Sequence, residues 1–245
     1  MIRLAVIGAE GRMGLAIAEA AAATADTMIA VGIDAGDDGA AVAAGSVDVL
    51  IDFSNPRAVP VTLALATRLG VPLVLGTTGL EPAHHAAIDA AAREIALIQT
   101  GNTSLGVTLL AHLVRDAAAR LGDDWDIEIV EMHHRHKVDA PSGTALLLGE
   151  AAAAGRGVAL DAASVRGRDG VTGAREAGTI GFASLRGGSV SGDHLVIIAS
   201  EGERIELGHR AESRAIFAKG ALRAARWLIG RPAGRYTMRD VLDLR

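Results

Sequence analysis

The sequence predicts an α/β protein of two domains: an N-terminal parallel sheet, followed by an α+β domain with an open mixed sheet. Its 245 residues suffice for two modest domains, each with its own core. Over residues 2–99, short apolar runs alternate with alanine-rich helical segments, a pattern typical of parallel sheets with crossover helices. From Asp126 on, polar and apolar residues alternate, as in strands with one face in water.

The apolar runs of the first domain are expected to form its strands: Ile2–Ile7, Met28–Ile33, Val47–Phe53, Pro72–Leu75 and Ile95–Gln99. Helices are expected between them: one ending near Thr24, then Val59–Leu69 and Pro82–Glu94. A final amphipathic helix, at about Ser213–Ile229, is expected to return to this domain and bury one side: Phe217, Leu222, Trp227 and Leu228. We therefore assign residues 1–104 and 214–245 to the first domain.

Residues 105–213 are expected to form the second domain. Its helices are expected at Val107–Leu121 and Thr144–Ala154, and its first strand at Asp126–Met132. Glycine-rich breaks separate three later strand-like runs and indicate an antiparallel meander: Thr179–Leu185, Gly192–Ser200 and Arg204–His209. The segment Val158–Ala177 is expected to be a long exposed connection, a length that often accompanies function.

Composition excludes several classes of function. A net charge of −5 without a basic tract argues against nucleic acid as a partner. The chain has no cysteine, which excludes disulfides, thiolate nucleophiles and thiolate metal sites. Apolar runs are too short for a secretory signal or a membrane span. We expect a cytoplasmic protein whose redox chemistry, if any, uses a bound cofactor.

Three glycines, Gly8, Gly11 and Gly14, lie between the first strand and the first helix. Such glycines permit a tight turn and close backbone approach to a pyrophosphate at a helix N-terminus, as in Rossmann-type sheets. Asp34 ends the second strand about 20 residues later, where a carboxylate binds the adenosine ribose. Plain turns at these positions are the alternative. Since Ala35–Asp48 contains no Lys or Arg, we predict NADH as the preferred coenzyme, with NADPH possible.

Further residues at strand ends suit the nicotinamide half of a coenzyme. Gly76-Thr77-Thr78-Gly79 follows the fourth strand, at the sheet edge where α/β proteins bind ligands. Its hydroxyls and amides can bind a carboxamide or a ribose, although the segment can equally be a simple turn. The segment Gly101-Asn102-Thr103-Ser104 follows the next strand in the same way.

The densest group of polar residues runs from Glu131 to Ala145. The histidines at positions 133, 134 and 136, with Arg135 and Lys137, form a cationic turn before a helix. That helix starts at Ser142-Gly143-Thr144, whose hydroxyls and amides add an anion site. This combination favours a carboxylated substrate, and a lysine or histidine among cations can donate a proton to a reduced imine. We expect Glu131 to orient or balance the turn.

Two alternatives to substrate binding apply to this turn. A metal site is disfavoured because neighbouring Arg135 and Lys137 repel a dication and no cysteine or suitably spaced carboxylate accompanies the histidines. A purely structural turn capped by Ser142 stays open. We expect no metal, structural or interfacial roles for His194 and His209, and solvent exposure for His84 and His85.

Taken together, these segments resemble the dihydrodipicolinate reductase family, also called 4-hydroxy-tetrahydrodipicolinate reductases. The most specific marker is HHRHKVDAPSGTA at residues 133–145. Supporting matches are GAEGRMG near the start, DFSNP at 52–56, GTTG at 76–79, GTIGFASLRGG from Gly178 and RDVLDL near the end. The resemblance covers nearly the whole chain.

The resemblance implies NAD(P)H-dependent reduction of 4-hydroxy-tetrahydrodipicolinate to tetrahydrodipicolinate, with loss of water, by a cytoplasmic homotetramer of lysine and diaminopimelate biosynthesis. It implies that His133 is a proton donor and acceptor and that Lys137 is a second proton donor. It implies that His134, Gly143 and Thr144 contact the substrate, and we add Ser142 to this group because its hydroxyl lies at the start of the helix. The implied coenzyme contacts are Gly8, Ala9, Glu10, Gly11, Arg12, Met13, Asp34, Gly76, Thr77, Thr78, Thr100, Gly101, Asn102 and Thr103. In the family the meander builds the sheet between subunits.

The chain departs from the family pattern beside the coenzyme. Ala35 replaces a frequent basic residue, the stretch between Asp34 and Val47 is short, and Thr103 stands where relatives often have Phe or Met. Two alternative functions remain at this point. One is another imine or amino-acid dehydrogenase of related build, which the stretch from His133 to Thr144 disfavours. The other is a coenzyme-sensing protein without turnover, which substrate-dependent NADH consumption would exclude.

Overall fold

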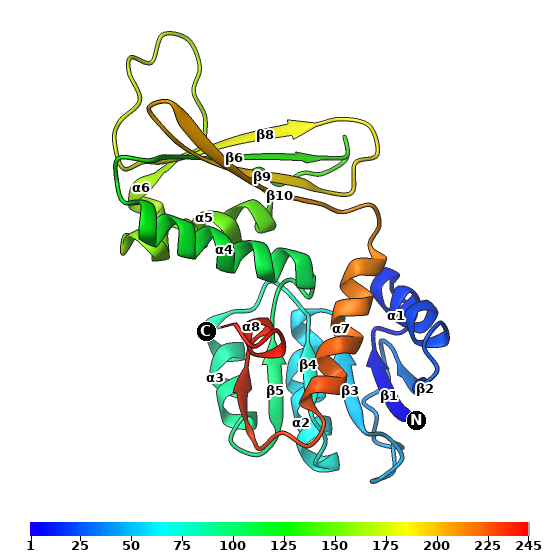
Figure 1. Cartoon of the computed structure of the whole chain (residues 1–245). Helices are drawn as coiled ribbons and strands as arrows, with labels where there is room; N and C mark the ends of the chain where they lie inside the picture. The colour runs from blue at the N-terminus through cyan, green and yellow to red at the C-terminus, as the bar shows by residue number, and fades with distance from the viewer. Residues whose placement is uncertain (245) are drawn as a thin grey trace. The chain divides into compact units, whose positions relative to one another are not determined.

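A computed structural model describes residues 1–244 of the chain (Figure 1). The chain divides into two compact units. Unit 1 comprises Met1–Leu105 and the segment that starts at Arg214, and unit 2 comprises Gly106–Ser213. Within residues 1–244, no helix combines the length and the apolar character needed to cross a membrane.

Unit 1 is built on a six-stranded parallel sheet with the order β11-β5-β4-β3-β1-β2. Its strands are β1 (Ile2–Ile7), β2 (Thr27–Ile33), β3 (Val49–Asp52), β4 (Leu73–Leu75), β5 (Ala96–Gln99) and β11 (Gly234–Tyr236). The chain runs from β1 to β2 and then returns to the other side of β1 to form β3. The strand order thus reverses between β1 and β3, and in open α/β sheets ligands bind at the carboxyl ends of such strands.

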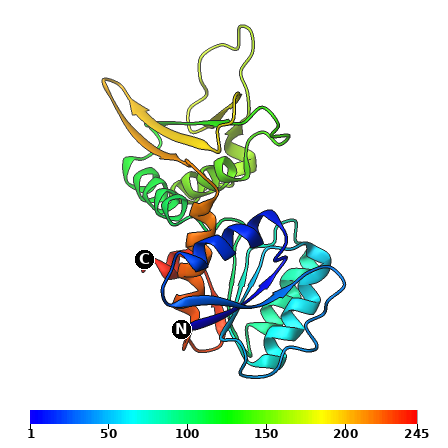
Figure 2. The same cartoon turned by 90° about the vertical axis from the view of Figure 1, so that its right-hand side faces the viewer.

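Helices cover both faces of this sheet (Figure 2). One face packs on α1 (Arg12–Ala22) and α7 (Ala215–Leu228), and the other on α2 (Val59–Leu69) and α3 (Pro82–Ala91). Successive side chains of a strand point to opposite faces, so Leu4 and Val6 join the first core while Ala5 and Ile7 join the second. Residues of α7, the last long helix, are part of the first of these cores.

The C-terminal segment adds two elements that the sequence pattern did not predict. After α7 the chain forms β11, which pairs with β5 at the sheet edge, and the short helix α8 (Met238–Val241). A capping box between Thr237 and Asp240 starts α8. Strand β11 is too short and too polar to show a strand period, so only its pairing with β5 reveals it.

Unit 2 has a five-stranded mixed sheet with the order β10-β9-β6-β8-β7. Its strands are β6 (Asp126–His133), β7 (Ser164–Val165), β8 (Ile180–Arg186), β9 (Asp193–Ser200) and β10 (Glu203–Arg210). Strand β6 pairs in parallel with β8 and antiparallel with β9. The predicted meander is therefore wrong: β9 and β10 form a hairpin, but β6 lies between β9 and β8 and separates them.

The two faces of this sheet differ in what covers them. Ile127 and Ile129 lie on the face that packs against α4 (Leu105–Leu121) and α5 (Gly143–Arg156). Within the described part of the chain, residues 1–244, no helix covers the opposite face (Figure 1). Val130 of β6 lies there, between its register partners Leu195 of β9 and Ala183 of β8, and all three side chains are partly or fully exposed.

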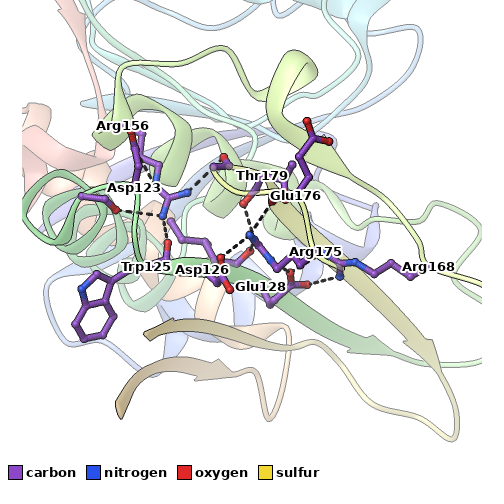
Figure 3. Close-up of polar contacts among 12 residues, drawn as sticks. Asp123, Trp125, Asp126, Glu128, Arg156, Arg168, Arg175, Glu176 and Thr179 are labelled. Atoms are coloured by element: carbon purple, nitrogen blue, oxygen red, sulfur yellow. Dashed lines mark hydrogen bonds and ion pairs between the residues drawn. The ribbon is translucent and has the colours of Figure 1, made fainter. Parts of the chain in front are cut away.

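The expected connection at Val158–Ala177 is partly ordered into secondary structure, with α6 (Leu160–Ala163) and β7 at its start. The rest of it is held to β6 by arginines (Figure 3). Arg168 binds Glu128 through two hydrogen bonds of 2.9 Å, and Arg175 binds Glu128 at 2.9 Å and Asp126 at 2.6 Å. Arg156, at the end of α5, donates to the carbonyl of Trp125 and so joins that helix to the start of β6.

Candidate active site

The glycine turn after β1 forms a close-packed cradle. Gly8 has a φ of +79°, and its N–H donates to the Ile33 carbonyl at 2.8 Å, which ties the turn to the end of β2. A Cβ on Gly14 would overlap the carbonyl oxygens of Gly8 and Ala9. The turn therefore needs glycine where α1 starts, and it leaves backbone amides at the N-terminus of α1.

Asp34 is linked directly to this turn. Its two carboxylate oxygens each lie 3.1 Å from the N–H of Glu10, which donates to them. The carboxylate is half-buried at the end of β2. The sequence placed Asp34 beside the glycine turn, and the structure brings the two together.

A cavity of about 700 Å³ lies at the carboxyl ends of β1, β2 and β3, where the strand order reverses. Its lining includes Gly8, Gly11 and Asp34. Asp37 and Asp38 also line it, and the one cation among its lining residues is Arg57. Arg57 follows Asn55, whose side chain accepts its N–H at 3.0 Å and starts the short helix η1 (Pro56–Ala58).

A second cavity of about 280 Å³ lies along the ends of β3, β4 and β5. It is lined by Met13, Phe53, Ser54, Gly76, Thr77, Thr78, Gly101, Asn102, Thr103 and Phe217. Most of the residues predicted to contact the nicotinamide half of a coenzyme thus lie around one pocket. Four predicted contacts, Ala9, Glu10, Arg12 and Thr100, are not part of the lining of either cavity.

Asp52, at the end of β3, joins the turns around the second cavity. Its side chain is fully buried and accepts hydrogen bonds from the hydroxyls of Ser54 at 2.6 Å, Thr62 at 2.6 Å and Thr77 at 2.9 Å. The N–H of Ser54 donates to it as well, at 2.8 Å. One buried carboxylate therefore holds together the turn after β3, the turn after β4, and helix α2 through its Thr62.

Thr103 is nearly fully buried, and its hydroxyl donates to the carbonyl of Phe217 in α7 at 2.7 Å. A Cβ on Gly220 would overlap the Thr103 carbonyl, so α7 lies against this turn. The Thr103 turn is therefore tied directly to α7.

In unit 2 the carboxyl end of β6 carries a buried polar cluster. His133 Nδ1 lies 2.6 Å from Glu131 Oε2, and Arg186 of β8 donates two hydrogen bonds of 2.8 Å to the same carboxylate. Glu131 is only 1% exposed. Burial alone raises the pKa of Glu131, but hydrogen bonds from Arg186 and His133 outweigh it and hold that pKa below its ordinary value.

His194 of β9 completes the cluster. Its ring lies edge-on to that of His133, with centroids 5.1 Å apart, and its Nε2 lies 3.1 Å from the Ser142 hydroxyl oxygen. That oxygen also accepts the N–H of Ala145 at 3.1 Å, the N-cap bond of α5. Burial, and then the nearby charge of His133, lowers the pKa of His194 to about 4. The interpretation of His194 as structural omitted this position beside His133.

The cationic turn after β6 is more exposed. Lys137 Nζ donates to Asp139 Oδ1 at 2.8 Å, so its nearest partner is a carboxylate and not another cation. The His134 N–H donates to the Val190 carbonyl at 2.8 Å. Gly143 begins α5 with open space around its Cα, while Ser142 is buried as the cap. Among residues 1–244, no three His, Asp or Glu side chains are grouped to hold a metal ion.

Several residues of these sites were not predicted from the sequence. Arg57, Phe53, Ser54 and Phe217 line the cavities, and Arg186 holds Glu131. A signal for Phe53 and Ser54 was present, because DFSNP follows an apolar strand just as the glycine and threonine turns do, and Arg57 comes directly after that motif. No local signal marks Phe217 or Arg186, which reach the sites from distant segments.

Unit 1 is a doubly wound parallel sheet with a glycine turn at the point where its strand order reverses, which is the class of fold that binds dinucleotides in two-domain oxidoreductases. Two family models then match almost all of it: the dihydrodipicolinate reductase N-terminus over residues 2–103 and its C-terminus over residues 106–242. The chain belongs to the dihydrodipicolinate reductase family, which confirms the resemblance seen in the sequence.

Curated relatives match along their full length. The chain is 56% identical over 250 residues to the 4-hydroxy-tetrahydrodipicolinate reductase of Zymomonas mobilis, covering 99% of this chain and 98% of the relative. Identity to the enzyme of the same name from Parvibaculum lavamentivorans is 53% over 266 residues, with 99% and 98% coverage.

Solved structures share the fold. A dipicolinate-bound dihydrodipicolinate reductase from Paenisporosarcina sp. TG-14 superposes with a TM-score of 0.80 at 23% identity, covering 97% of each chain. An aspartate dehydrogenase from Thermotoga maritima superposes less well, with a TM-score of 0.51 at 11% identity. Both likenesses support the α/β fold with its second mixed sheet.

Proposed function

We propose that this chain reduces 4-hydroxy-tetrahydrodipicolinate to tetrahydrodipicolinate, with loss of water and with NAD(P)H as the reductant, in lysine and diaminopimelate biosynthesis. The observation that carries the proposal is the full-length identity of 56% to a curated reductase of that name. The polar clusters of both units are consistent with it.

The coenzyme fits unit 1 on the chain's own residues. The glycine turn has no room for a Cβ at Gly14, and it presents backbone amides at the start of α1 beside the Asp34 carboxylate. Asp34 is suited to accept hydrogen bonds from the adenosine ribose. The bound nicotinamide coenzyme would supply the hydride. The second cavity, with the hydroxyl of Thr78 and the amide of Asn102 in its lining, would hold the nicotinamide half.

We propose NADH as the preferred coenzyme. Asp34, Asp37 and Asp38 place three carboxylates in the lining of the larger cavity, and a 2′-phosphate would be repelled by them. Arg57 is the one cation among those lining residues, and it is where a 2′-phosphate would bind if NADPH is used.

Equilibrium binding of both coenzymes, followed by the fluorescence of the reduced nicotinamide, tests this preference. We expect tighter NADH binding by the wild-type chain. Arg57→Gln is expected to weaken NADPH binding about tenfold, as loss of one charge-assisted contact does, and to change NADH binding less. A wild-type preference for NADPH would show the assignment to be wrong.

For the substrate, we propose the turn after β6 and the N-terminus of α5. His134 and the hydroxyl and amides of Ser142, Gly143 and Thr144 would bind its carboxylates, since a helix N-terminus attracts anions and Gly143 leaves space above the backbone. Ser142 is buried as the helix cap and is suited to fix the geometry of this N-terminus.

His133 and Lys137 are proposed to donate the proton that accompanies hydride transfer. His133 is held at Nδ1 by Glu131, which leaves Nε2 for proton exchange, and Lys137 Nζ is oriented by Asp139. Both groups belong to the turn that is proposed to bind the substrate.

The first experiment follows coenzyme absorbance while the preceding step of the pathway supplies fresh substrate from pyruvate and aspartate semialdehyde. Substrate-dependent oxidation of NADH or NADPH is expected. Coenzyme binding without any substrate-dependent oxidation would refute the proposed reaction and would favour a related dehydrogenase or a sensor.

We further propose that the protein works in the cytoplasm as a homotetramer, with the helix-free face of the unit 2 sheet as the contact surface. That face carries partly or fully exposed apolar side chains: Val130, Met132, Ala183, Leu185, Leu195 and Ile197. Apolar sheet faces of this kind are usually covered by another layer.

A further inference from the structure

The carboxylate of Glu131 has an unusual number of strong contacts for a side chain that the proposed reaction does not use. It accepts two hydrogen bonds of 2.8 Å from Arg186 and one of 3.2 Å from the Ser142 N–H. Its Oε2 also lies 2.6 Å from His133 Nδ1. A buried charge this well paired stays ionised, because its hydrogen bonds replace those it would make with water.

An ionised carboxylate can only accept hydrogen bonds. The proton in the contact between Glu131 and His133 therefore belongs to Nδ1 of the imidazole. Whenever His133 is neutral, its other nitrogen, Nε2, must then carry the lone pair, because a neutral imidazole has one N–H. The contact thus selects one of the two tautomers.

The surroundings of Nε2 agree with this division of roles. An ideal Cβ on Gly192 would lie 2.9 Å from His133 Nε2, so the glycine keeps a side chain away from that nitrogen. The φ of Gly192, +154°, is also one that other residues rarely adopt. Nδ1 thus contacts a carboxylate, whereas Nε2 lies beside a glycine, which has no side chain.

We propose that Glu131 and Arg186 are positioning residues for His133: Arg186 fixes the Glu131 carboxylate, and Glu131 holds the imidazole as its Nδ1–H tautomer with Nε2 directed at the substrate. This inference rests on the proposed role of His133. Arg186 comes from β8, so the parallel pairing of β6 with β8, in which Arg186 lies opposite His133, brings the three side chains together.

His194 assists by staying uncharged. It is almost fully buried beside His133, and its Nδ1 has no hydrogen-bond partner among residues 1–244. Its Nε2 is within hydrogen-bond distance of the Ser142 hydroxyl. With His194 neutral, Arg186 is the charged partner of the Glu131 carboxylate, and His133 contributes a neutral Nδ1–H donor.

Histidine tautomers can be measured without reference to catalysis. We would label the histidines with 15N and record long-range 1H–15N spectra above neutral pH, assigning His133 by its loss in His133→Asn. A protonated Nδ1 and an unprotonated Nε2 are expected in the wild-type chain. An Nε2–H tautomer there would overturn the proposal, whatever the variants do.

Glu131→Gln tests whether Glu131 is what selects the Nδ1–H tautomer of His133. Its amide can donate to Nδ1 as well as accept from it, so the Nδ1–H tautomer should no longer dominate. The matched control is Glu128→Gln, because Glu128 lies on the same strand and is also held by arginines (Figure 3). Three positions before Glu131, it lies on the other face of the sheet. The control should leave the His133 spectrum unchanged.

Kinetics give a second readout. Glu131→Gln should lower kcat about 10²-fold while the KM for the coenzyme stays within about twofold, and Glu128→Gln should change neither by more than about twofold. The double variant His133→Ala/Glu131→Gln should be no slower than His133→Ala, because Glu131 acts through His133. Additive losses would show that Glu131 acts on its own and would contradict the proposal.

These results separate the two levels of inference. Full turnover by His133→Ala would refute the proposed proton role of His133 and leave the tautomer measurement as an independent result. Loss of turnover by His133→Ala with unchanged turnover by Glu131→Gln would keep the proposed function and refute the positioning role of Glu131.

Discussion

His133 and Lys137 lie four positions apart, at the two ends of the basic turn, and have different surroundings. His133 is 8% exposed and tied to a buried carboxylate, whereas Lys137 pairs with the largely exposed Asp139. The pKa of Asp139 lies below its ordinary value, first because of its hydrogen bond with Lys137. The two side chains of the turn therefore differ in burial and in the partner that orients each of them.

Substitution of either residue should slow the reaction without weakening coenzyme binding. We expect His133→Ala and Lys137→Ala each to lower kcat roughly 10²-fold or more, the usual contribution of a proton donor. Affinity for NADH should stay nearly constant in both. The control is Lys219→Ala, which changes the other lysine, exposed on α7. Turnover at the wild-type rate in both test variants would disprove these roles.

His194 should make unit 2 sensitive to acid. Burial lowers its folded-state pKa to about 4 from an ordinary 6.5, so between these values the unfolded chain binds a proton that the folded chain does not. Stability from this residue is complete above pH 6.5 and is lost as the pH falls toward 4. At pH 5 the loss should be roughly 2 kcal/mol.

Comparison with His194→Gln isolates this contribution, because glutamine does not titrate. Urea unfolding of unit 2 can be followed through Trp125 in a Trp227→Phe background, in which Trp125 is the remaining tryptophan. Between pH 7 and pH 5 the free energy of unfolding of the protein with His194 should fall by roughly 2 kcal/mol more than that of the glutamine variant. Equal losses would mean that His194 titrates normally in the folded protein.

Among the elements, the turns after β3 and β4 depend on one residue. Asp52 connects Ser54, Thr62 and Thr77, and its removal would leave buried hydroxyls without an acceptor. The contact to α2 through Thr62 also fixes where that helix lies against the turn.

We therefore expect Asp52→Ala to lower the free energy of unfolding of unit 1 by about 3 kcal/mol and to weaken NADH binding. Asp48→Ala is the control, since Asp48 forms a partly exposed pair with Arg3 at 2.6 Å and should cost about 1 kcal/mol. Urea unfolding and coenzyme titration measure both effects. An Asp52 variant as stable as the Asp48 variant would contradict the role given to these turns.

The strands and longer helices of residues 2–99 could be predicted closely, because each has its own local pattern. Helix α2 was predicted at its observed bounds, Val59–Leu69: a proline lies in its first turn, and Gly70 ends it in the left-handed conformation, φ +65°. The four longer strands of unit 2 were predicted nearly as well, but β7 and the pairing of the strands were not. The alternation in β9 shows which residues face the core, yet it does not show that β6 and not β8 is its neighbour.

For the whole molecule, the bare sheet face of unit 2 predicts association. Leu195→Glu would place a charge at the centre of that face, opposite Val130 in the register, and should reduce the solution mass from that of four chains. Val171→Glu is the control, because Val171 is fully exposed in the loop before β8. Light scattering coupled to size exclusion measures the mass. A wild-type chain that elutes as a monomer would refute the tetramer.

Local pattern and spacing were enough to predict the parallel sheet, the glycine turn with Asp34 beside it, and the turn of histidines and lysine, because each depends on residues close together in the chain. The contacts of Arg57, Phe217 and Arg186 with the sites, and the insertion of β6 between β9 and β8, depend on segments far apart in the chain. Hydrophobic periodicity indicates which face of a strand is buried, but the neighbouring strands with which it pairs are selected by packing and hydrogen bonding in the folded chain. Chemistry that depends on such partners, above all the tautomer of His133, could be inferred only once the fold had brought them together.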